Sequence, residues 1–407
     1  MGVLNRRDLL KHTTVAAAAL GGAGLSAPLE ALAAAKIELP FGNGERALVK
    51  YPQKRPLIQM TTRPPQLETP FPVFNEGVIT PNDAFFVRYH LADIPLRIDP
   101  EKFRIDIKGK VNSALSLSLQ DIKTSFEPIE IVAVNQCSGN SRGFFEPRVA
   151  GGQLANGAMG NARWRGVPVK AVLDKAGVMS GARQVTFNGL DGPVVPETPD
   201  FVKALDIDHA RDGEVMIAYA MNGADLPHLN GYPVRLVVPG HYGTYWVKHL
   251  NEITVVDGIY DGFWMKSAYR IPSNVCACTP PGQAPTATVP INRFNVRSFI
   301  TSLQDGASVK ANADTPVKGI AFDGGYGVTD VLLSADGGKT WTGTQLGQDL
   351  GKYSFREWQT SVRLPPGTHK LCVRAINRIG QSQPMEPLWN PAGYMRNVVE
   401  TVQVRAA

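Results

Sequence analysis

The sequence is poor in the features that mark several large classes of protein. Its 407 residues include only four Cys, too few for a disulfide-framed fold of this length. After residue 35 no uninterrupted apolar run approaches the roughly 20 residues of a membrane-spanning helix. The formal net charge of +6 is small, unlike the concentrated positive charge of a nucleic-acid-binding protein. We therefore expect no membrane span and no nucleic-acid partner.

Motifs for several common cofactors are also missing. The sequence has no Cys-x-x-Cys-His motif for attached haem, no His-rich zinc signature, no Walker phosphate loop and no Gly-rich dinucleotide fingerprint. Cys276 and Cys278 lie in a Pro-rich segment and Cys372 lies in an expected strand, so none of them completes a zinc site with Cys137. We therefore expect no haem.

The first 33 residues have the order of an export signal. The pair Arg6-Arg7 precedes a small-residue apolar stretch over 15–25, and Ala31-Leu32-Ala33 is a plausible cleavage site. Paired Arg residues indicate the twin-arginine route, which carries folded proteins. We expect a periplasmic protein that receives a bulky cofactor before export. The alternative, an Ala-rich helix, would be broken by three glycines: Gly21, Gly22 and Gly24.

Length and composition predict two folded domains after this signal. The 40 Gly and 31 Pro against 9 Met favour turns and short strands over a helical bundle. We expect an α+β protein: a Pro-rich arm over 34–75, a mixed α/β cofactor-binding domain over 76–271, a linker over 272–290 and an all-β, immunoglobulin-like sandwich over 291–407.

Local patterns predict individual elements of the first domain. Ile129–Asn135 and Tyr232–Val238 read as buried strands, and Val167–Ala176 has helical spacing that ends at Gly177.

Two hairpins are expected in the sandwich. Val331–Ser334 leads into a turn over 335–338. Val362–Leu364 and Lys370–Asn377 flank a second turn, and alternate residues of the latter strand share one face: Leu371, Val373 and Ala375.

Cys137 is the first candidate for chemistry, because it follows the expected strand 129–135 directly. Strand ends of this kind place ligands in α/β domains. A thiolate there could be a nucleophile or a metal ligand, or Cys137 could be a packed apolar residue. The neighbouring Gly139 and Arg142 favour a functional role.

Arg88 and His90 form the second candidate, in the segment 85–90. Residues at i and i+2 of an extended segment face the same way, so the two side chains could hold an anion together. Taken alone, they could equally be surface residues near aromatics.

These two segments, in this order, resemble the sulfite oxidase family of molybdenum enzymes. The resemblance covers about 350 residues and continues through four later segments: Arg163–Val167, Ala218–Gly223, Gly231–Gly240 with Val247-Lys248, and Ser334–Trp341 with Pro387–Asn390. It is specific because the segments occur in the family's order.

The resemblance implies a molybdenum ion held by molybdopterin and by the thiolate of Cys137. Arg88 then reaches the substrate, and Arg142 and Tyr219 match second-sphere and substrate-pocket positions. Further positions match cofactor-binding residues of the family: Phe86, His90, Asp191, Asn230, Arg235, Trp246 and Lys248. Sulfite and the cofactor phosphate are anions that need fixed cationic donors. The alternative for Arg235, a strand residue paired with a surface carboxylate, conflicts with its apolar surroundings in the sequence.

The chain departs from the family at two places. Asn230 stands where many members carry His, and Asn cannot carry charge. A second substrate-binding Arg, expected from the C-terminal domain, has no clear counterpart near 396–401.

The expected activity is oxidation of sulfite to sulfate by a homodimer, with electrons passing to a c-type cytochrome or another external acceptor. A periplasmic molybdenum-dependent methionine sulfoxide reductase is the closest alternative, although such enzymes generally lack the sandwich. A non-catalytic binding protein on the same scaffold is another.

Overall fold

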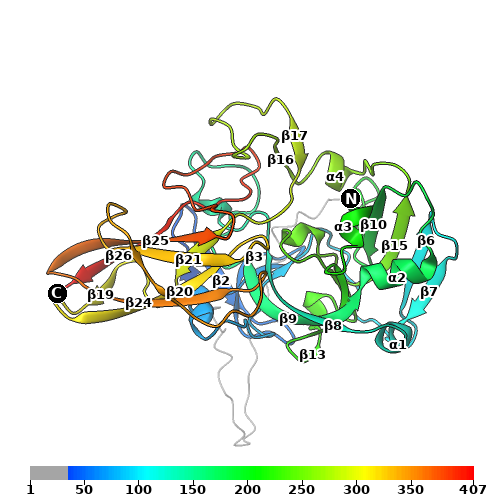
Figure 1. Ribbon diagram of the computed structural model, residues 1–407, viewed down its shortest axis with the longest axis horizontal. Coiled ribbons are helices and arrows are strands. Elements are labelled where there is room, and N and C mark those ends of the chain that lie inside the picture. Colours follow the sequence, from blue (N-terminus) through cyan, green and yellow to red (C-terminus); the bar gives the residue numbers. More distant parts are fainter. Residues whose placement is uncertain (1–34) are drawn as a thin grey trace, which may run out of the picture. The chain divides into compact units, whose positions relative to one another are not determined.

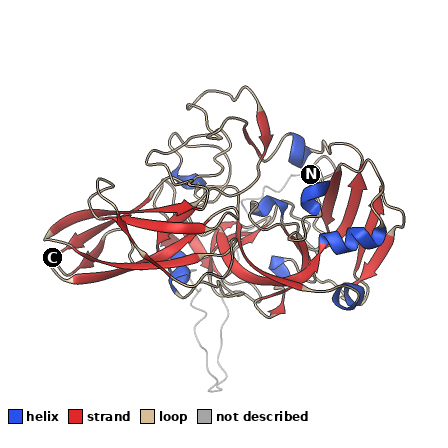
Figure 2. Cartoon of the chain, in the orientation of Figure 1, coloured by secondary structure: helices blue, strands red, loops and turns tan. Residues whose placement is uncertain are grey.

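The computed structural model describes residues 35–407, and strands make up most of its regular secondary structure (Figures 1 and 2). The predicted export signal over 1–33 lies outside the described residues. Helices are few and short, and each begins and ends within a turn or two: α1 (Leu119–Thr124), α2 (Val169–Ala176), α3 (Ile207–Ala210), α4 (Phe263–Lys266), and the 3-10 turns η1 (Phe71–Asn75), η2 (Arg142–Phe144), η3 (His228–Asn230) and η4 (Gly243–Tyr245).

The segment that we expected to be an irregular arm forms most of a five-stranded sheet. Its prolines lie between short strands, and strand pairing satisfies the backbone groups there. The sheet has the order β1-β2-β3-β4-β5, and its last strand carries Arg88. The strands are β1 (Lys36–Glu38), β2 (Glu45–Val49), β3 (Leu57–Thr61), β4 (Gln66–Glu68) and β5 (Val87–Arg88).

Two further sheets complete the first domain. One has the order β11-β10-β15-β6-β7, with β15 and β6 parallel and the other pairs antiparallel. The other has the order β13-β12-β9-β8, with β14 beside β12. Their strands are β6 (Arg104–Gly109), β7 (Leu115–Ser118), β8 (Ile129–Gln136), β9 (Met159–Pro168), β10 (Gln184–Gly189), β11 (Lys203–Asp206), β12 (Met216–Met221), β13 (Ala224–Asp225), β14 (Arg235–Val237) and β15 (Leu250–Val256).

The expected elements of this domain are confirmed with shifted ends. Strand β8 covers 129–136, and α2 begins two residues later than expected because 167–168 still belong to β9. Gly177 ends α2 in the left-handed conformation, with φ of 72°. The strand expected at 232–238 is shorter, since β14 begins only after Pro233, which has no N–H to donate.

The second domain is a two-layer β structure around its own apolar core. Val317, Ala321 and Trp358 from one sheet meet Leu371 and Val373 from the other. Figure 1 shows these strands in yellow to red. The sheets have the orders β18-β20-β24-β23 and β19-β26-β25-β21-β22. Their strands are β18 (Arg297–Ile300), β19 (Ala307–Val309), β20 (Asp314–Phe322), β21 (Val328–Ser334), β22 (Thr342–Gly343), β23 (Gln345–Leu346), β24 (Arg356–Arg363), β25 (Gly367–Asn377) and β26 (Glu400–Ala406).

One of the two expected hairpins in this domain is present and the other is not. Strand β21 turns back into β22 as predicted. Strands β24 and β25 do not pair, because β24 joins β20 and β23 whereas β25 joins β21 and β26. The turn over Pro365-Pro366-Gly367 therefore crosses between the two sheets. The expected inward face is confirmed, since Leu371, Val373 and Ala375 are fully buried.

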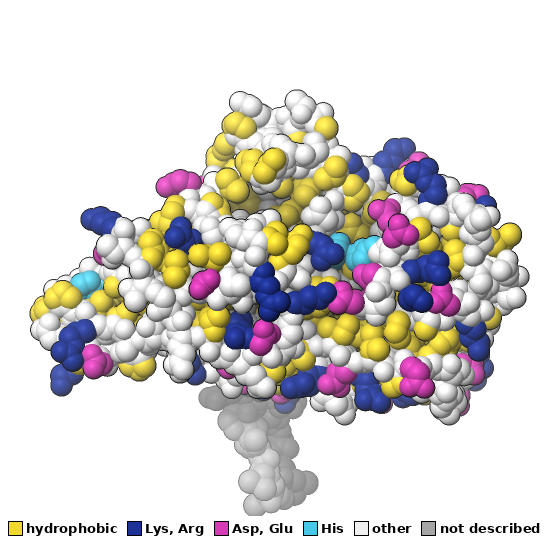
Figure 3. Space-filling view, in the orientation of Figure 1, with side chains coloured by type: hydrophobic (Ala, Val, Ile, Leu, Met, Phe, Trp, Pro, Cys, Tyr) yellow, Lys and Arg dark blue, Asp and Glu magenta, His cyan; other side chains and the backbone are white. Residues whose placement is uncertain are grey.

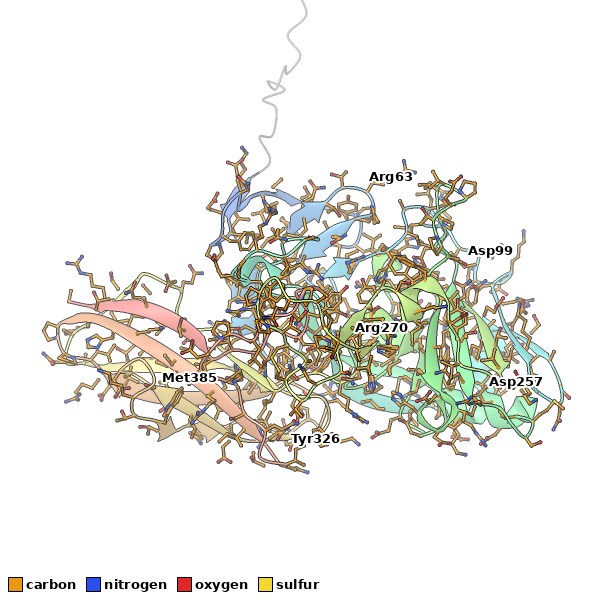
Figure 4. All side chains as sticks on the ribbon, turned by 90° about the horizontal axis from the view of Figure 1, so that it is seen from above. Arg63, Asp99, Asp257, Arg270, Tyr326 and Met385 are labelled. Atoms are coloured by element: carbon orange, nitrogen blue, oxygen red, sulfur yellow. A yellow bond between two sulfur atoms is a disulfide. The ribbon has the colours of Figure 1, made fainter. Side chains whose placement is uncertain are left out.

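A Pro-rich excursion separates the two domains. Two antiparallel strands, β16 (Arg270–Pro272) and β17 (Thr288–Pro290), pair at its two ends. Between these strands Cys276 and Cys278 form a disulfide, a pairing that sequence spacing did not reveal. Figure 4 shows Arg270, at the start of β16, among the densely packed side chains near the middle of the view.

Charged side chains of both signs are interspersed on the face shown in Figure 3. No helix within residues 35–407 has both the length and the apolar character needed to cross a bilayer.

Candidate functional site

A cavity lies among segments far apart in the sequence. Most of the residues predicted from the sequence meet there. The side chains that line it come from the start of β5, the end of β8, the segment around β14 and the residue before β16: Phe85, Phe86, Arg88, His90, Asn135, Cys137, Ser138, Asn230, Arg235, Gly243, Thr244, Lys248 and Tyr269.

Arg88 and His90 reach the cavity together, as the extended segment 85–90 predicted. Strand β5 pairs with β4, and the buried Leu67, Val87 and Tyr89 pack behind it. The His90 ring stacks on Phe201 with the centroids 3.6 Å apart. Burial lowers the pKa of His90 well below its usual value, so the ring is neutral near pH 7. His90 is therefore a hydrogen-bonding group here and not a cation.

Cys137 lies at the end of β8, with its thiol uncombined and 8% of its surface exposed. Its N–H donates to the carbonyl of Ala158 at 2.9 Å, and its carbonyl accepts from Asn140, which makes a tight turn. This turn directs the Cys137 side chain into the cavity. The buried strand, the turn and the lining position together favour a ligand over a packed apolar residue.

Arg142 lies beneath the Cys137 turn and does not line the cavity. Its Nε donates to the carbonyl of Ala392 at 3.1 Å, and its guanidinium covers the Tyr394 ring at 4.9 Å. A Cβ atom at Gly139 would lie 2.8 Å from the Arg142 Cζ, so the glycine is required for this packing. Arg142 thus joins the Cys137 turn to the C-terminal segment, which agrees with a second-sphere position.

Arg235 and Lys248 bring positive charge to the opposite wall. Arg235 is 2% exposed, donates to the carbonyls of Asn230 and Trp246 at 3.0 Å each, and lies between the rings of Trp164 and Trp246. Burial lowers the pKa of Arg235 to about 9 and that of Lys248 to about 7, the latter also through the nearby Arg235. Trp246 contributes its carbonyl and ring face but does not itself line the cavity.

These cations have no carboxylate partners. Within residues 35–407, no carboxylate oxygen lies within 4.0 Å of the charged nitrogens of Arg88, Arg235 or Lys248. The sequence alternative for Arg235, a pair with a surface carboxylate, is therefore wrong. Burying a charge without a partner is costly, so convergent unpaired cations indicate a site for an anion.

Asn230 and Asp191 differ in their relation to the cavity. Asn230 lines it and is 1% exposed, with its Nδ2 donating to the carbonyl of Phe86 at 3.0 Å. Asp191 is buried outside the lining, and burial raises its pKa to about 6 although the charge of Lys248 acts in the other direction. The structure places Asp191 close enough to influence Lys248 but does not bring it into the cavity.

Tyr269 takes the place that we predicted for Tyr219. The Tyr219 ring lies half-buried on β12 beneath the ammonium of Lys123, 5.7 Å away, and is absent from the lining. The assignment of Tyr219 to the substrate pocket is therefore wrong. Tyr219 lies at a shift in register of β12 against β9, between Ala218 and Ala220.

The Tyr269 hydroxyl lies 3.3 Å from Arg88 Nη2 and 2.5 Å from His90 Nε2. Its backbone has a φ of 56°, in the left-handed region that non-glycine residues rarely adopt. The aromatic run over 263–269, directly before the Pro-rich excursion, was the available signal in the sequence.

Sequence reasoning also missed Tyr394. Its ring stacks on Tyr269 with the planes 9° apart and the centroids 5.4 Å apart. It belongs to the C-terminal segment that follows Trp389 and Asn390, and the carbonyl of Tyr394 accepts from the Asn390 side chain at 2.8 Å. The nearby Arg396 faces elsewhere, since it pairs with Glu400 at 3.1 Å. The C-terminal segment therefore contacts, through an aromatic side chain, a residue that lines the cavity.

The comparisons with known proteins agree with this site. The model of the oxidoreductase molybdopterin binding domain matches residues 90–264, and that of the Mo-co oxidoreductase dimerisation domain matches 288–407. The chain is 31% identical to the sulfite oxidase of Gallus gallus, over 90% of this chain and 81% of that one. The chain belongs to the sulfite oxidase family of molybdenum enzymes.

Two further comparisons define the extent of this likeness. The mitochondrial sulfite oxidase of Macaca fascicularis is 33% identical over 88% of this chain and 67% of its own. The chain spans about two thirds of the length of such mitochondrial relatives. The sulfane dehydrogenase SoxCD from Paracoccus pantotrophus shares the fold, with a TM-score of 0.73 at 23% identity, over 98% of this chain and 96% of that one.

The cavity fits the molybdenum–pterin group of the sulfite oxidase family. Several buried polar atoms on its lining residues have no hydrogen-bond partner in the part of the chain that the structure describes: Asn135 Oδ1, Ser138 Oγ, Arg235 Nε and Thr244 Oγ1. A Cβ atom at Gly243 would lie 2.4 Å from Asn135 Oδ1 and would narrow the cavity. Unpaired cations, unpaired polar atoms and one free thiol are the donor set that a phosphorylated, metal-bearing heterocycle requires.

Proposed function

We propose that the protein oxidises sulfite to sulfate at a molybdenum centre held by Cys137 and molybdopterin. One observation carries this proposal: three cations, Arg88, Arg235 and Lys248, which have no carboxylate partner among the described residues, converge with a free thiol on one cavity. When bound, the molybdenum centre supplies the two-electron oxidation of sulfite, with the added oxygen coming from water and two protons and two electrons leaving.

The residues divide into two groups by position. Arg235, Lys248 and Asn230 lie along the wall that would hold the pterin and its phosphate, with the indole of Trp246 supporting the Arg235 guanidinium. His90 contributes a neutral ring to the same site. These groups bind and orient the cofactor, because their donors are fixed by hydrogen bonds to backbone carbonyls.

Arg88 and Tyr269 would bind the substrate. The guanidinium provides fixed donors for an oxyanion. Burial raises the pKa of Tyr269 well above its usual value, so its hydroxyl keeps a proton and acts as a donor. Tyr394 covers Tyr269 and limits the approach to this pair. A small dianion such as sulfite suits a narrow, cationic pocket of this kind.

We extend the proposal to the setting of the enzyme. The twin-arginine pattern supports export in the folded state to the periplasm, and electrons would pass to a c-type cytochrome or another external acceptor. The absence of a haem motif from the sequence supports a separate acceptor. The match of 288–407 to a dimerisation domain supports a homodimer joined through the sandwich, which we infer to be immunoglobulin-like.

The test is steady-state oxidation of sulfite by the purified protein, measured as reduction of ferricytochrome c, together with elemental analysis for molybdenum. We expect about one molybdenum per chain and turnover that depends on sulfite. A protein that carries molybdenum and fails to oxidise sulfite with any one-electron acceptor would disprove the substrate assignment. A protein that binds none would favour the non-catalytic alternative.

Methionine sulfoxide reduction is not favoured. The reductases of that class generally lack the sandwich, whereas here the C-terminal segment places Tyr394 against Tyr269 in the cavity. Loss of methionine sulfoxide with a reduced donor, measured beside sulfite oxidation, separates the two activities.

A further inference from the structure

Lys54 is a buried cation next to the cavity, and the function proposed above assigns it no role. It lies in the turn between β2 and β3 and is 3% exposed. Its ammonium donates to the carbonyls of Asn82 and Phe85 at 2.7 and 2.9 Å and to Oδ1 of Asn230. It has no carboxylate within 4.0 Å among the described residues. Burying an ammonium whose contacts are all neutral oxygens costs free energy. We therefore looked for a role of Lys54 in the adjacent cavity.

The contact with Asn230 determines which way that side chain points. An ammonium can only donate, so the atom that faces Lys54 must be the amide oxygen. The amide nitrogen then faces the carbonyl of Phe86, to which it donates at 3.0 Å. Both contacts require the same orientation. The second N–H of Asn230 is left for the cavity, which Asn230 lines.

The turn that carries Lys54 is attached to the Asn230 segment at a second point. The N–H of His228 donates to Oε1 of Gln53 at 2.9 Å. Gln53 has a φ of 60°, a left-handed conformation that lets the turn present Gln53 and Lys54 to the same segment. The turn between β2 and β3 therefore contacts both ends of η3, the 3-10 turn that runs from His228 to Asn230.

We propose that Lys54 is a positioning residue of the cofactor site, which orients the Asn230 amide toward the bound pterin. This rests on the proposed function, because it assumes that a molybdenum–pterin group occupies the cavity. Burial lowers the pKa of Lys54 to about 7, and an anion in the cavity would favour its charged form.

The experiment measures retention of the cofactor by the full-length holoenzyme. Molybdenum and pterin per chain are determined after timed incubation and gel filtration, for the wild type, Lys54→Met, Asn230→Ala and the double variant. Loss of outer-shell partners typically weakens metal sites 10- to 100-fold, so we expect each single variant to release cofactor at least about tenfold faster. Lys50→Met changes an exposed lysine directly after β2, and this matched control should behave as the wild type.

The double variant separates positioning from a general structural effect. If Lys54 acts through Asn230, the double variant releases cofactor no faster than the faster single variant. Effects that multiply in the double variant, or wild-type retention by Lys54→Met, would overturn the proposal. If Lys54→Met does not accumulate, Lys54→Gln replaces it, and wild-type retention by that variant has the same meaning. A wild type that holds no molybdenum refutes the proposed function itself, whereas retention by both wild type and Lys54→Met refutes only the role of Lys54.

Discussion

Buried arginines serve opposite purposes in two regions of the molecule. In the cofactor pocket, meaning Arg88, Cys137, Arg235 and Lys248 with their neighbours, the charges lack carboxylate partners within residues 35–407. At the domain junction, Arg297 is fully buried but pairs with Glu400 at 2.6 Å and donates to Ser141 Oγ at 3.0 Å.

Glu400 at the junction also accepts from Arg396. The difference shows that burial alone does not mark a functional cation. The informative feature is whether the protein itself supplies the counter-charge, because the charge of a paired cation is balanced within the protein and that of an unpaired one is not. The following variants test this distinction, beginning with the largest expected effect.

Cys137→Ser should abolish most of the activity of the cofactor pocket. The hydroxyl of Ser is a harder and much weaker ligand than a thiolate, so sulfite turnover should fall by more than about 100-fold, beyond what outer-shell changes cost. Circular dichroism and the thermal midpoint should stay near those of the wild type. Near-normal turnover in the variant would refute the ligand assignment. Cys372→Ser, a buried thiol in β25, is the control and should keep its turnover.

Exchanging one arginine in each region should give opposite results. Arg297→Met leaves Glu400 with only Arg396, so the free energy of unfolding should fall by about 3 kcal/mol. Arg235→Met removes a charge that has no carboxylate partner among the described residues, so the stability of the cofactor-free chain should fall by less than in Arg297→Met, while bound molybdenum falls at least about tenfold.

Chemical denaturation gives the free energy of unfolding of each variant, and elemental analysis gives the amount of molybdenum that it binds. Arg363→Met, from an exposed pair with Asp314, should change stability by less than about 1 kcal/mol. The distinction fails if Arg235→Met destabilises the cofactor-free chain as much as Arg297→Met does.

A pair of tyrosines tests the border of the cofactor pocket. Tyr269→Phe removes a donor that faces Arg88 and His90, and a hydrogen bond to a charged group contributes about 1.5–3 kcal/mol. The specificity constant for sulfite should therefore fall by at least about tenfold. Tyr219→Phe should leave it unchanged, since that ring faces Lys123. The specificity constants of both variants are measured by steady-state kinetics over a range of sulfite concentrations. An equal decrease in both would return Tyr219 to the substrate pocket.

This pair also shows how far the sequence could predict the site. Arg88, His90 and Cys137 were predictable because strand alternation and a strand end determine where side chains point over a few residues. Tyr269 and Tyr394 were not, since their approach to Arg88 depends on a left-handed residue and on the packing of two domains. Lys54 was missed for a related reason: the proline-rich composition of this segment did not indicate the short strands on either side of the turn in which Lys54 lies.

The fold, too, was predictable only where it depends on residues close together in the sequence. Strand β8 and helix α2 were predicted almost to the residue, because local periodicity specifies them. The pairing of β24 and β25 was predicted wrongly, because the turn 365–367 is compatible both with a hairpin and with a crossing between sheets. Only the two-layer core, which forms from residues distant in sequence, decides between these.

The smallest expected effect concerns Lys203, another buried cation near the cofactor pocket. It donates to the carbonyl of Trp264 and lies 5.3 Å above the Tyr269 ring, and burial lowers its pKa to about 7. The unfolded chain keeps this proton up to about pH 10, whereas the folded chain releases it near pH 7. The unfolded state therefore binds more protons between these values, and the stability of the cofactor-free chain should rise with pH across this window.

Between pH 7.5 and 8.5 the contribution of Lys203 should be about 1 kcal/mol, close to the limit for one group. It is measured as the change in the free energy of unfolding of the wild type minus that of Lys203→Met over the same interval. Arg297 remains charged throughout, so Arg297→Met should keep the wild-type slope. A Lys203→Met slope equal to that of the wild type would mean that Lys203 stays protonated when buried. The counter-charge would then be supplied within the protein, and Lys203 would belong with Arg297 and not with the cations of the cofactor pocket.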